Sequence, residues 1–188
     1  YNHLMTKNVF VILANGCETI EAMSPIDVLR RAGCHVTTLS LSSSVEVKTA
    51  QDVIVKADKS IGSVSSIPDA IVLPGGLGGA KNIAASSPLK SLCKSILDNG
   101  GHVCAICATP GVALAPWGML HGKRATCYPS FEKSFHSSTT YVDEQVVVDG
   151  QIVTSAGPGT ALPFSYKILE VLGMKEKASQ LSKGMLYL

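Results

Sequence analysis

The residues best suited to chemistry surround Cys107. An apolar run at 103–106 ends at this cysteine, and Ala108-Thr109-Pro110-Gly111 precede a helix-like stretch at 112–115. This order is typical of a strand-to-helix nucleophile elbow, a sharp turn that leaves a side chain at the mouth of a sheet. The free N–H groups at the start of the next helix favour a thiolate over a thiol. We therefore predict that Cys107 is acidic and acts as a nucleophile.

Two other uses of the neighbouring cysteine are disfavoured. Cys104 and Cys107 form a Cys-x-x-Cys pair, but a thioredoxin-like dithiol needs both residues at a helix start, and Cys104 falls inside the predicted strand. A metal site formed by His102, Cys104 and Cys107 is equally disfavoured. His102 and Cys104 share a strand face, but no fourth ligand for a zinc ion is evident. The sequence therefore predicts neither a metal nor another cofactor.

Glu18 and Glu21 lie three residues apart, just after the first predicted strand, and so share a helix face. Both would be solvated in the simplest interpretation. The flanking residues are apolar, however, and the end of this strand should border the elbow. A carboxyl buried beside a thiolate has a raised pKa and stays protonated, so it can donate a hydrogen bond to sulfur or transfer a proton.

Glycine-rich breaks follow two further strands. The segment Gly75-Gly76-Leu77-Gly78-Gly79 lacks the phosphate-binding patterns, and a tight turn whose N–H groups line an oxyanion hole fits the elbow better. The segment Gly157-Pro158-Gly159 is either a similar loop at the rim of the site or only a turn.

The elements that must position these residues alternate along the chain. Strands are predicted at 9–14, 36–41, 69–73 and 103–106, with two short strands in 45–55 and an Asp-Gly hairpin at 146–153. Helices are predicted at 18–31, 80–85, 89–97, 161–172 and 175–181. Pro25 either begins a helix capped by Ser24 or kinks a longer one, and Gly33 ends it. The pattern indicates an α/β domain with a mainly parallel sheet and helices on both faces.

Composition excludes several classes of protein. Of the 188 residues, 46% are hydrophobic and 16% charged, and the net charge of +2 comes without a long basic run, so neither nucleic acid nor a membrane surface is an expected partner. No apolar stretch reaches the roughly 18 residues of a membrane span. The six cysteines sit in apolar runs, which favours a reducing, cytoplasmic setting. Residues 1–4 precede Met5 and are interpreted as an extraneous remnant or the end of a trimmed leader.

From Met5 to about Leu186 the chain resembles the ThiJ/PfpI superfamily, in its parkinsonism-associated "DJ-one" branch. The motifs that carry the resemblance are VILANGCETIE (11–21), VLRRAG (28–33), VLPGG (72–76), AICA (105–108) and TSAGPGT (154–160). The resemblance implies a single flavodoxin-like, doubly wound domain over 5–188. It also implies a homodimer whose contacts involve the helix that contains Pro25 and Asp27.

The same resemblance assigns roles to individual residues. Cys107 becomes the reactive cysteine, Glu21 its partner acid, and the amides of Gly75, Gly76 and Ala108 the anion-stabilising donors. The activities reported for the superfamily are conversion of methylglyoxal and glyoxal to hydroxy acids without a cofactor, repair of glycated molecules, oxidation sensing and chaperone activity.

The chain departs from the superfamily beside the cysteine. Tyr128 stands where many members have a histidine, and a phenol with a pKa near 10 is a poor base at neutral pH. Ala156 replaces an arginine at the rim. Glu21 is then the strongest candidate for proton transfer, although His102, His121 and His136 stay open as substitutes. Tyr128, Glu18, Gly157 and Pro158 are expected at the rim.

Three functional hypotheses follow. The leading one is a cysteine-dependent enzyme of the glyoxalase III type that acts on a small α-oxoaldehyde or a glycated substrate. The second is an oxidative-stress sensor or redox-regulated chaperone that acts through oxidation of Cys107. The third, disfavoured by the missing histidine, is a cysteine peptidase.

Overall fold

A seven-stranded sheet organises the chain. The computed structural model describes residues 5–187, so the interpretation of residues 1–4 lies outside the described part. The strand order is β10-β11-β7-β6-β1-β2-β5, parallel except for the β10–β11 hairpin. The strands of this sheet are β1 (Asn8–Leu13), β2 (His35–Ser40), β5 (Lys59–Ser60), β6 (Ala70–Leu73), β7 (His102–Ile106), β10 (Val146–Asp149) and β11 (Ile152–Ser155).

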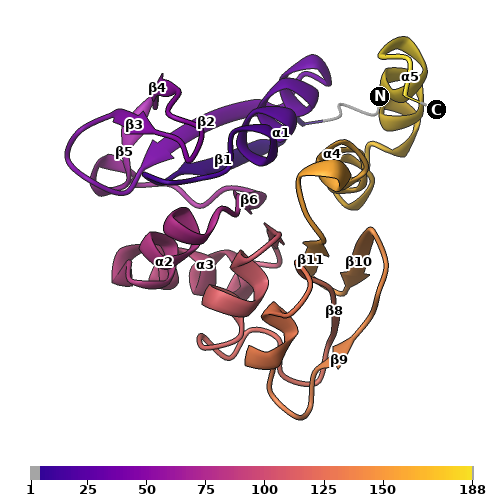
Figure 1. Cartoon of the computed structure of the whole chain (residues 1–188). Coiled ribbons are helices and arrows are strands. Elements are labelled where there is room, and N and C mark those ends of the chain that lie inside the picture. Colours follow the sequence, from indigo (N-terminus) through magenta and orange to yellow (C-terminus); the bar gives the residue numbers. More distant parts are fainter. Residues whose placement is uncertain (1–4, 188) are drawn as a thin grey trace.

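Helices cover both faces of this sheet (Figure 1). The helices are α1 (Thr19–Arg31), α2 (Leu77–Ala84), α3 (Ser87–Asp98), α4 (Ala161–Val171) and α5 (Lys175–Gly184). The helices α1, α4 and α5 contribute to a core around Val28 and Phe164, and α2 and α3 contribute to another around Ile83 and Ile96. The order β2-β1-β6-β7-β11 is that of the flavodoxin-like fold, so the predicted fold class is confirmed.

Two small sheets lie outside the main one. The strands β3 (Glu46–Lys48) and β4 (Ile54–Lys56) form an antiparallel hairpin, as the sequence predicts for 45–55. The strands β8 (Arg124–Ala125) and β9 (Thr140–Tyr141) form a short parallel pair.

Helix α1 continues through Pro25, so the alternative in which Ser24 starts the helix is wrong. The cap is Glu18, whose side chain accepts a hydrogen bond from the backbone N–H of Glu21. Proline removes one helical hydrogen bond, but Pro25 is buried, and α1 packs on α4, which offsets part of that loss. Gly33 has φ +87° and follows the last turn, as predicted.

Three other local predictions need correction. Helix α2 begins at Leu77, directly after the glycine turn, rather than at residue 80. The stretch after Cys107 is a π-helical turn, Pro110–Leu114, instead of an α-helix. In the β10–β11 hairpin Asp149 pairs with Ile152, so the two loop residues are Gly150 and Gln151 rather than an Asp-Gly pair.

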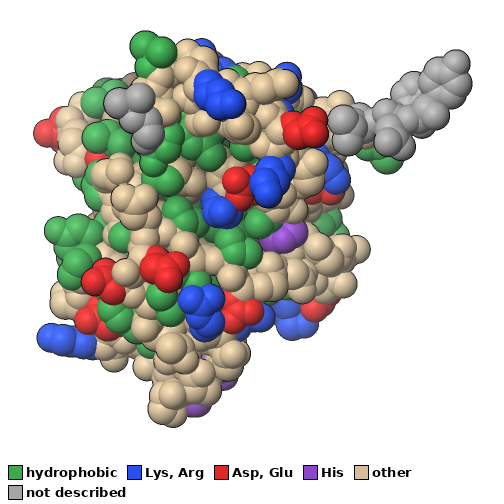
Figure 2. Space-filling view, turned by 90° about the vertical axis from the view of Figure 1, so that its right-hand side faces the viewer, with side chains coloured by type: hydrophobic (Ala, Val, Ile, Leu, Met, Phe, Trp, Pro, Cys, Tyr) green, Lys and Arg blue, Asp and Glu red, His purple; other side chains and the backbone are tan. Residues whose placement is uncertain are grey.

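The charged side chains are mixed on the surface. On the face in Figure 2, Lys and Arg are interspersed with Asp and Glu, and that face has no basic patch. Within residues 5–187, no helix has both the length and the apolar character needed to cross a membrane.

Gly33 and Gly76 offer a matched test of how the fold builds its tight turns. Both have positive φ, but a Cβ at Gly33 meets no atom within 4 Å, whereas one at Gly76 would lie 2.5 Å from the carbonyl oxygen of Gly16. Gly33→Ala should therefore lower the free energy of unfolding by about 1 kcal/mol, the cost of the backbone conformation alone. Gly76→Ala should lower it by about 3 kcal/mol or more. Urea denaturation measures both, and equal losses would contradict the backbone contact between Gly76 and Gly16.

Candidate active site

Three parallel strands, β1, β6 and β7, end at one edge of the sheet, and Cys107 directly follows β7. Cys107 has φ +66°, a conformation that is strained for a residue with a side chain. Two backbone hydrogen bonds hold it there. Its N–H donates to the carbonyl of Ser155 (2.9 Å), and its own carbonyl accepts from the N–H of Tyr128 (2.8 Å). The sharp turn expected at the elbow is present.

The glycine turn at the end of β6 lies against the elbow. A Cβ at Gly75 would lie 2.5 Å from Oε1 of Glu21 and 2.6 Å from Cβ of Cys107. Only glycine therefore fits between these two side chains. The hydroxyl of Thr109 donates to the carbonyl of Pro74 (2.7 Å), which ties the turn after Cys107 to the glycine turn.

Glu21 is fully buried in the first turn of α1. Its Oε1 accepts a hydrogen bond from the N–H of Gly75 (2.9 Å), whereas its Oε2 is buried without a hydrogen-bond partner. The Gly75 amide therefore already serves Glu21. Because a backbone N–H has one hydrogen to donate, this amide is engaged with Glu21 here, and its expected role in stabilising a reacting anion stays a prediction.

Glu18 lies outside the cysteine–carboxyl pair. It caps α1 through its carboxylate (2.8 Å to the N–H of Glu21), and its own N–H donates to the carbonyl of Gly75 (3.0 Å). Glu18 therefore orients the start of α1 against the glycine turn. Its charge also contributes to the raised pKa of Glu21. Glu18 therefore positions the helix, and its expected place at the rim stays a prediction.

Burial is the first cause of the shifted pKa values in this site. It raises the pKa of Glu21 to about 7, and it raises the pKa of Cys107 to about 12, to which the charge of Glu21 adds. The start of the next helix alone does not lower the pKa of Cys107 below its ordinary value, so the predicted acidity of this thiol depends on Glu21 as well and stays a prediction. Burial and mutual repulsion disfavour negative charges on Glu21 and Cys107 at the same time, so this pair carries at most one charge near neutral pH.

The distribution of hydrogen-bond donors decides where a single charge lies. The amides of Gly76 and Ala108 face the sulfur of Cys107 and lower its pKa. The Glu21 carboxyl receives one amide, at Oε1, which leaves Oε2 free to hold a proton. A protonated Oε2 would also donate to the sulfur, giving the thiolate three donors. Taken singly, the pKa values of about 7 for Glu21 and about 12 for Cys107 place the charge on Glu21. We propose the opposite assignment for the singly ionised pair, a Cys107 thiolate beside a protonated Glu21, because the sulfur then has more hydrogen-bond donors than the carboxylate.

The predicted rim residues lie together on the other side of the elbow. The ring of Tyr128 is 3.3 Å from where a Cβ of Gly157 would be, and Tyr128 is 46% exposed. Pro158 begins the short 3₁₀ turn after Gly157. Phe131 meets Tyr128 edge to face, with ring centroids 6.3 Å apart. The rim next to Cys107 therefore carries no charged side chain at these four positions, and two of them, Tyr128 and Phe131, are aromatic.

The structure places His102 at the far end of β7 from Cys107, and it places His121 and His136 against each other. His102 begins β7, whereas Cys107 follows its other end. His121 and His136 stack with ring centroids 4.2 Å apart. Within the described residues, no group of three or more His, Cys, Asp and Glu side chains could hold a metal ion. Glu21 is thus the titratable side chain that the structure brings to Cys107.

Sequence reasoning missed two groups that hold the elbow. They are the hydroxyl of Thr109 and the carbonyl of Ser155. A polar residue two positions after the nucleophile, buried among small apolar residues, was the available signal for Thr109. No local signal marks Ser155, because its contact crosses between neighbouring strands.

The fold and the site define a flavodoxin-like protein with a buried cysteine–carboxyl pair at a nucleophile elbow. The chain matches the DJ-1/PfpI family over residues 7–171 and belongs to that family. It is 45% identical to "Protein dj-1beta" of Drosophila melanogaster over 97% of this chain and 98% of the relative. It is 36% identical to "Glutathione-independent glyoxalase DJR-1.2" of Caenorhabditis elegans, over 95% of this chain and 96% of the relative.

A solved structure supports the same assignment. The structure of "Toxoplasma gondii DJ-1, oxidized" is 39% identical, with a TM-score of 0.93 over 97% of this chain and 99% of that one. The chain spans 41% and 47% of the length of two Arabidopsis thaliana relatives.

Two substitutions of Glu21 test where the charge lies. In Glu21→Gln the amide can still accept from Gly75 and donate to sulfur, so Cys107 should keep an apparent pKa below the ordinary thiol value of about 8.5. Glu21→Leu removes both hydrogen bonds, and the apparent pKa of Cys107 should rise by at least about one unit. The rate of iodoacetamide alkylation against pH measures this, with Cys107→Ser as the background. An unchanged profile in Glu21→Leu would contradict the inferred hydrogen bond.

Proposed function

We propose that this protein converts small α-oxoaldehydes, such as methylglyoxal and glyoxal, to 2-hydroxy acids without a cofactor. The observation that carries the proposal is the convergence of Glu21 and Cys107 on either side of Gly75, with an orphan carboxyl oxygen buried in the site. The name of the Caenorhabditis elegans relative, a glutathione-independent glyoxalase, supports the same reaction class.

Covalent attack would be the first step. The Cys107 thiolate adds to the aldehyde carbon, so that an S–C bond forms and the carbonyl π electrons move to oxygen. The amides of Gly76 and Ala108, released from the sulfur as it loses its charge, are the available donors for this oxygen. Protonated Glu21 then transfers its proton to the oxygen, giving a neutral hemithioacetal and a Glu21 carboxylate.

Proton transfer by Glu21 would complete the conversion. The carboxylate removes the hydrogen of the former aldehyde carbon, the electron pair moves onto the neighbouring ketone oxygen, and Glu21 returns the proton to that oxygen, so that a neutral enediol forms. Glu21 then removes the hydroxyl proton at the former aldehyde carbon and returns it to the neighbouring carbon, which gives a 2-hydroxyacyl thioester. Water cleaves this ester, which releases the hydroxy acid and restores the thiol. The sum is one oxoaldehyde plus one water to one hydroxy acid, with no external oxidant or reductant.

The pH dependence follows from the shared proton. Beside a neutral Cys107 the carboxyl of Glu21 has a pKa of about 7, and the sulfur offers a second place for the charge, so the pair forms its singly ionised state with an apparent pKa at or below about 7. The second ionisation lies far higher, because the remaining charge opposes it. Turnover should therefore rise toward neutral pH and stay level above it. A glycated thiol or amine would be a second form of substrate, through the same attack on a masked carbonyl.

Lactate formation from methylglyoxal, measured in a chelator, tests the enzyme proposal. Cys107→Ser should lose activity by at least about a hundredfold, because the nucleophile is absent. Glu21→Gln should lose about a hundredfold as well, because an amide transfers no proton, even though the sulfur stays reactive to alkylation. Tyr128→Phe keeps the aromatic rim and serves as a matched control, with at least half of the activity expected. Full turnover in Cys107→Ser would reject the mechanism.

A second function, sensing of peroxide, is favoured by the same orphan oxygen of Glu21. Two equivalents of hydrogen peroxide would convert the Cys107 thiolate to a sulfinate, each transferring one oxygen atom to sulfur and leaving as water or hydroxide. Protonated Oε2 of Glu21 would then donate to a sulfinate oxygen. Such oxidation could control a chaperone activity. The Toxoplasma gondii relative is described as oxidised in its solved structure.

Intact-mass and peptide mass spectrometry after mild peroxide treatment test this second function. The peptide that contains Cys107 should gain two oxygen atoms. Glu21→Leu should stop at lower occupancy or proceed to the sulfonate, because the stabilising donor is gone. Retention of an unmodified Cys107 under conditions that fully oxidise exposed Met5 would count against the sensor.

The cellular setting is also a proposal. All six cysteines are free, which supports a reducing compartment such as the cytoplasm. The homodimer implied by the family resemblance stays a prediction. Its expected contacts involve the helix that contains Pro25 and Asp27, of which Pro25 is buried within one chain and Asp27 is exposed. A cysteine peptidase is disfavoured, because Glu21 rather than a histidine accompanies Cys107.

A further inference from the structure

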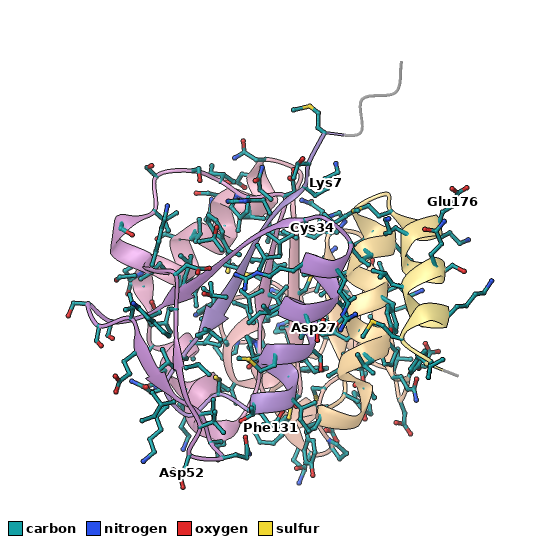
Figure 3. The ribbon with its side chains drawn as sticks, turned by 90° about the horizontal axis from the view of Figure 1, so that it is seen from above. Lys7, Asp27, Cys34, Asp52, Phe131 and Glu176 are labelled. Carbon is teal, nitrogen blue, oxygen red and sulfur yellow. The ribbon has the colours of Figure 1, made fainter. Side chains whose placement is uncertain are left out.

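The C-terminal helix α5 has few apolar anchors. Of its ten residues only Ala178 is buried, and its main packing partner is α4. Figure 3 shows α5 along the outer edge of the molecule, with α4 between it and α1, and with Glu176 pointing away from the body. The other apolar contacts of this region with the core come from Leu181, from two methionines, Met174 and Met185, and from Tyr187, whose ring centroid lies 5.3 Å from that of Tyr166. These methionines therefore supply much of what holds α5.

The two methionines flank α5, and the sulfur of each accepts a hydrogen bond from a buried residue. Met174, directly before α5, accepts from the thiol of Cys34 at the edge of β2, with the two sulfur atoms 3.8 Å apart. Met185, directly after α5, accepts from the phenol of Tyr166 on α4, with 3.4 Å between oxygen and sulfur. Cys34 and Tyr166 are each 7% exposed, whereas both methionines are partly exposed. Oxidants can therefore reach the acceptors, while the donors are fixed in the core.

We propose that Met174 and Met185 are peroxide-modification sites whose oxidation to the sulfoxide loosens α5 from α4. The thioether sulfur attacks one peroxide oxygen, an S–O bond forms, the O–O bond breaks, and the other oxygen leaves as water after proton transfer. The sulfur is oxidised by two electrons and the peroxide is reduced. The oxidant is hydrogen peroxide itself, and the step needs no other reactant.

The geometry gives the direction of the effect. A sulfoxide places a polar oxygen where the sulfur now packs against the core around Val28 and Leu169. It also moves the hydrogen-bond acceptor outward from sulfur to oxygen. Tyr166 and Cys34 are packed and cannot follow, so the methionine side chain must move instead. Because Met174 and Met185 lie at the two ends of α5, movement of their side chains weakens the contact of α5 with α4.

Hydrogen exchange measured by mass spectrometry tests the proposal. The starting protein carries Cys107→Ser, so that oxidation at the elbow contributes nothing. It is compared with a second protein that also carries Met174→Leu and Met185→Leu, because leucine has a similar volume and cannot form a sulfoxide. Met5, which is 82% exposed, reports how far the peroxide treatment has gone in both. Each protein is compared with its own untreated sample.

Peroxide should add one oxygen to each of Met174 and Met185 and speed the exchange of α5 amides about tenfold, which corresponds to about 1.4 kcal/mol of local opening free energy. Exchange in β1, β6 and β7 should not change. The leucine variant should show no acceleration, and methionine sulfoxide reductases should restore slow exchange in the treated protein.

Three results would overturn the proposal. One is full oxidation at both methionines with unchanged exchange in α5. Another is equal acceleration in the leucine variant. The third is complete oxidation of Met5 while Met174 and Met185 stay unmodified.

Discussion

The hydrogen bond from the N–H of Gly75 to Oε1 of Glu21 is the contact on which the site depends. A buried carboxyl needs at least one donor, and this amide supplies it at 2.9 Å. The same contact fixes which carboxyl oxygen remains free, because Oε2 is left unpartnered and buried beside the elbow. Gly75 must lack a side chain for this arrangement, since a Cβ would collide with both Glu21 and Cys107. One glycine therefore lets the carboxyl of Glu21 and the side chain of Cys107 lie next to each other at the end of β6.

The rest of the fold serves to hold this contact. The turn after β6 reaches α1 through the N–H of Glu18 and reaches the elbow through the hydroxyl of Thr109. The strained backbone of Cys107 is kept by bonds to neighbouring segments on both sides of the chain. A parallel sheet with its strand ends at one edge is what makes three such turns meet. Stability away from this edge comes from the two cores on either side of the sheet. Figure 1 shows the helices that lie on the two faces of the sheet.

Much of this arrangement could be predicted from the sequence, because its signals are local. Continuous apolar runs mark the buried strands, and the residues around Cys107 mark the elbow. The rule that sites lie at the carboxyl ends of parallel strands then brings Glu21 near the cysteine. The failures concern contacts between distant segments. Nothing local shows that the Gly75 amide is taken by Glu21, or that Glu18 caps a helix that passes through Pro25. The pKa of Cys107 likewise depends on burial and on Glu21 rather than on the following helix alone.

The central claim is that Glu21 holds the proton and Cys107 the charge when the pair is singly ionised. The most direct measurement is an infrared difference spectrum between the unmodified protein and Glu21→Gln at about neutral pH. The account predicts the carbonyl stretching band of a protonated carboxylic acid, present in the unmodified protein and absent from the variant. A spectrum in which Glu21 contributes only carboxylate bands would contradict the account and would place the charge on Glu21 beside a neutral thiol.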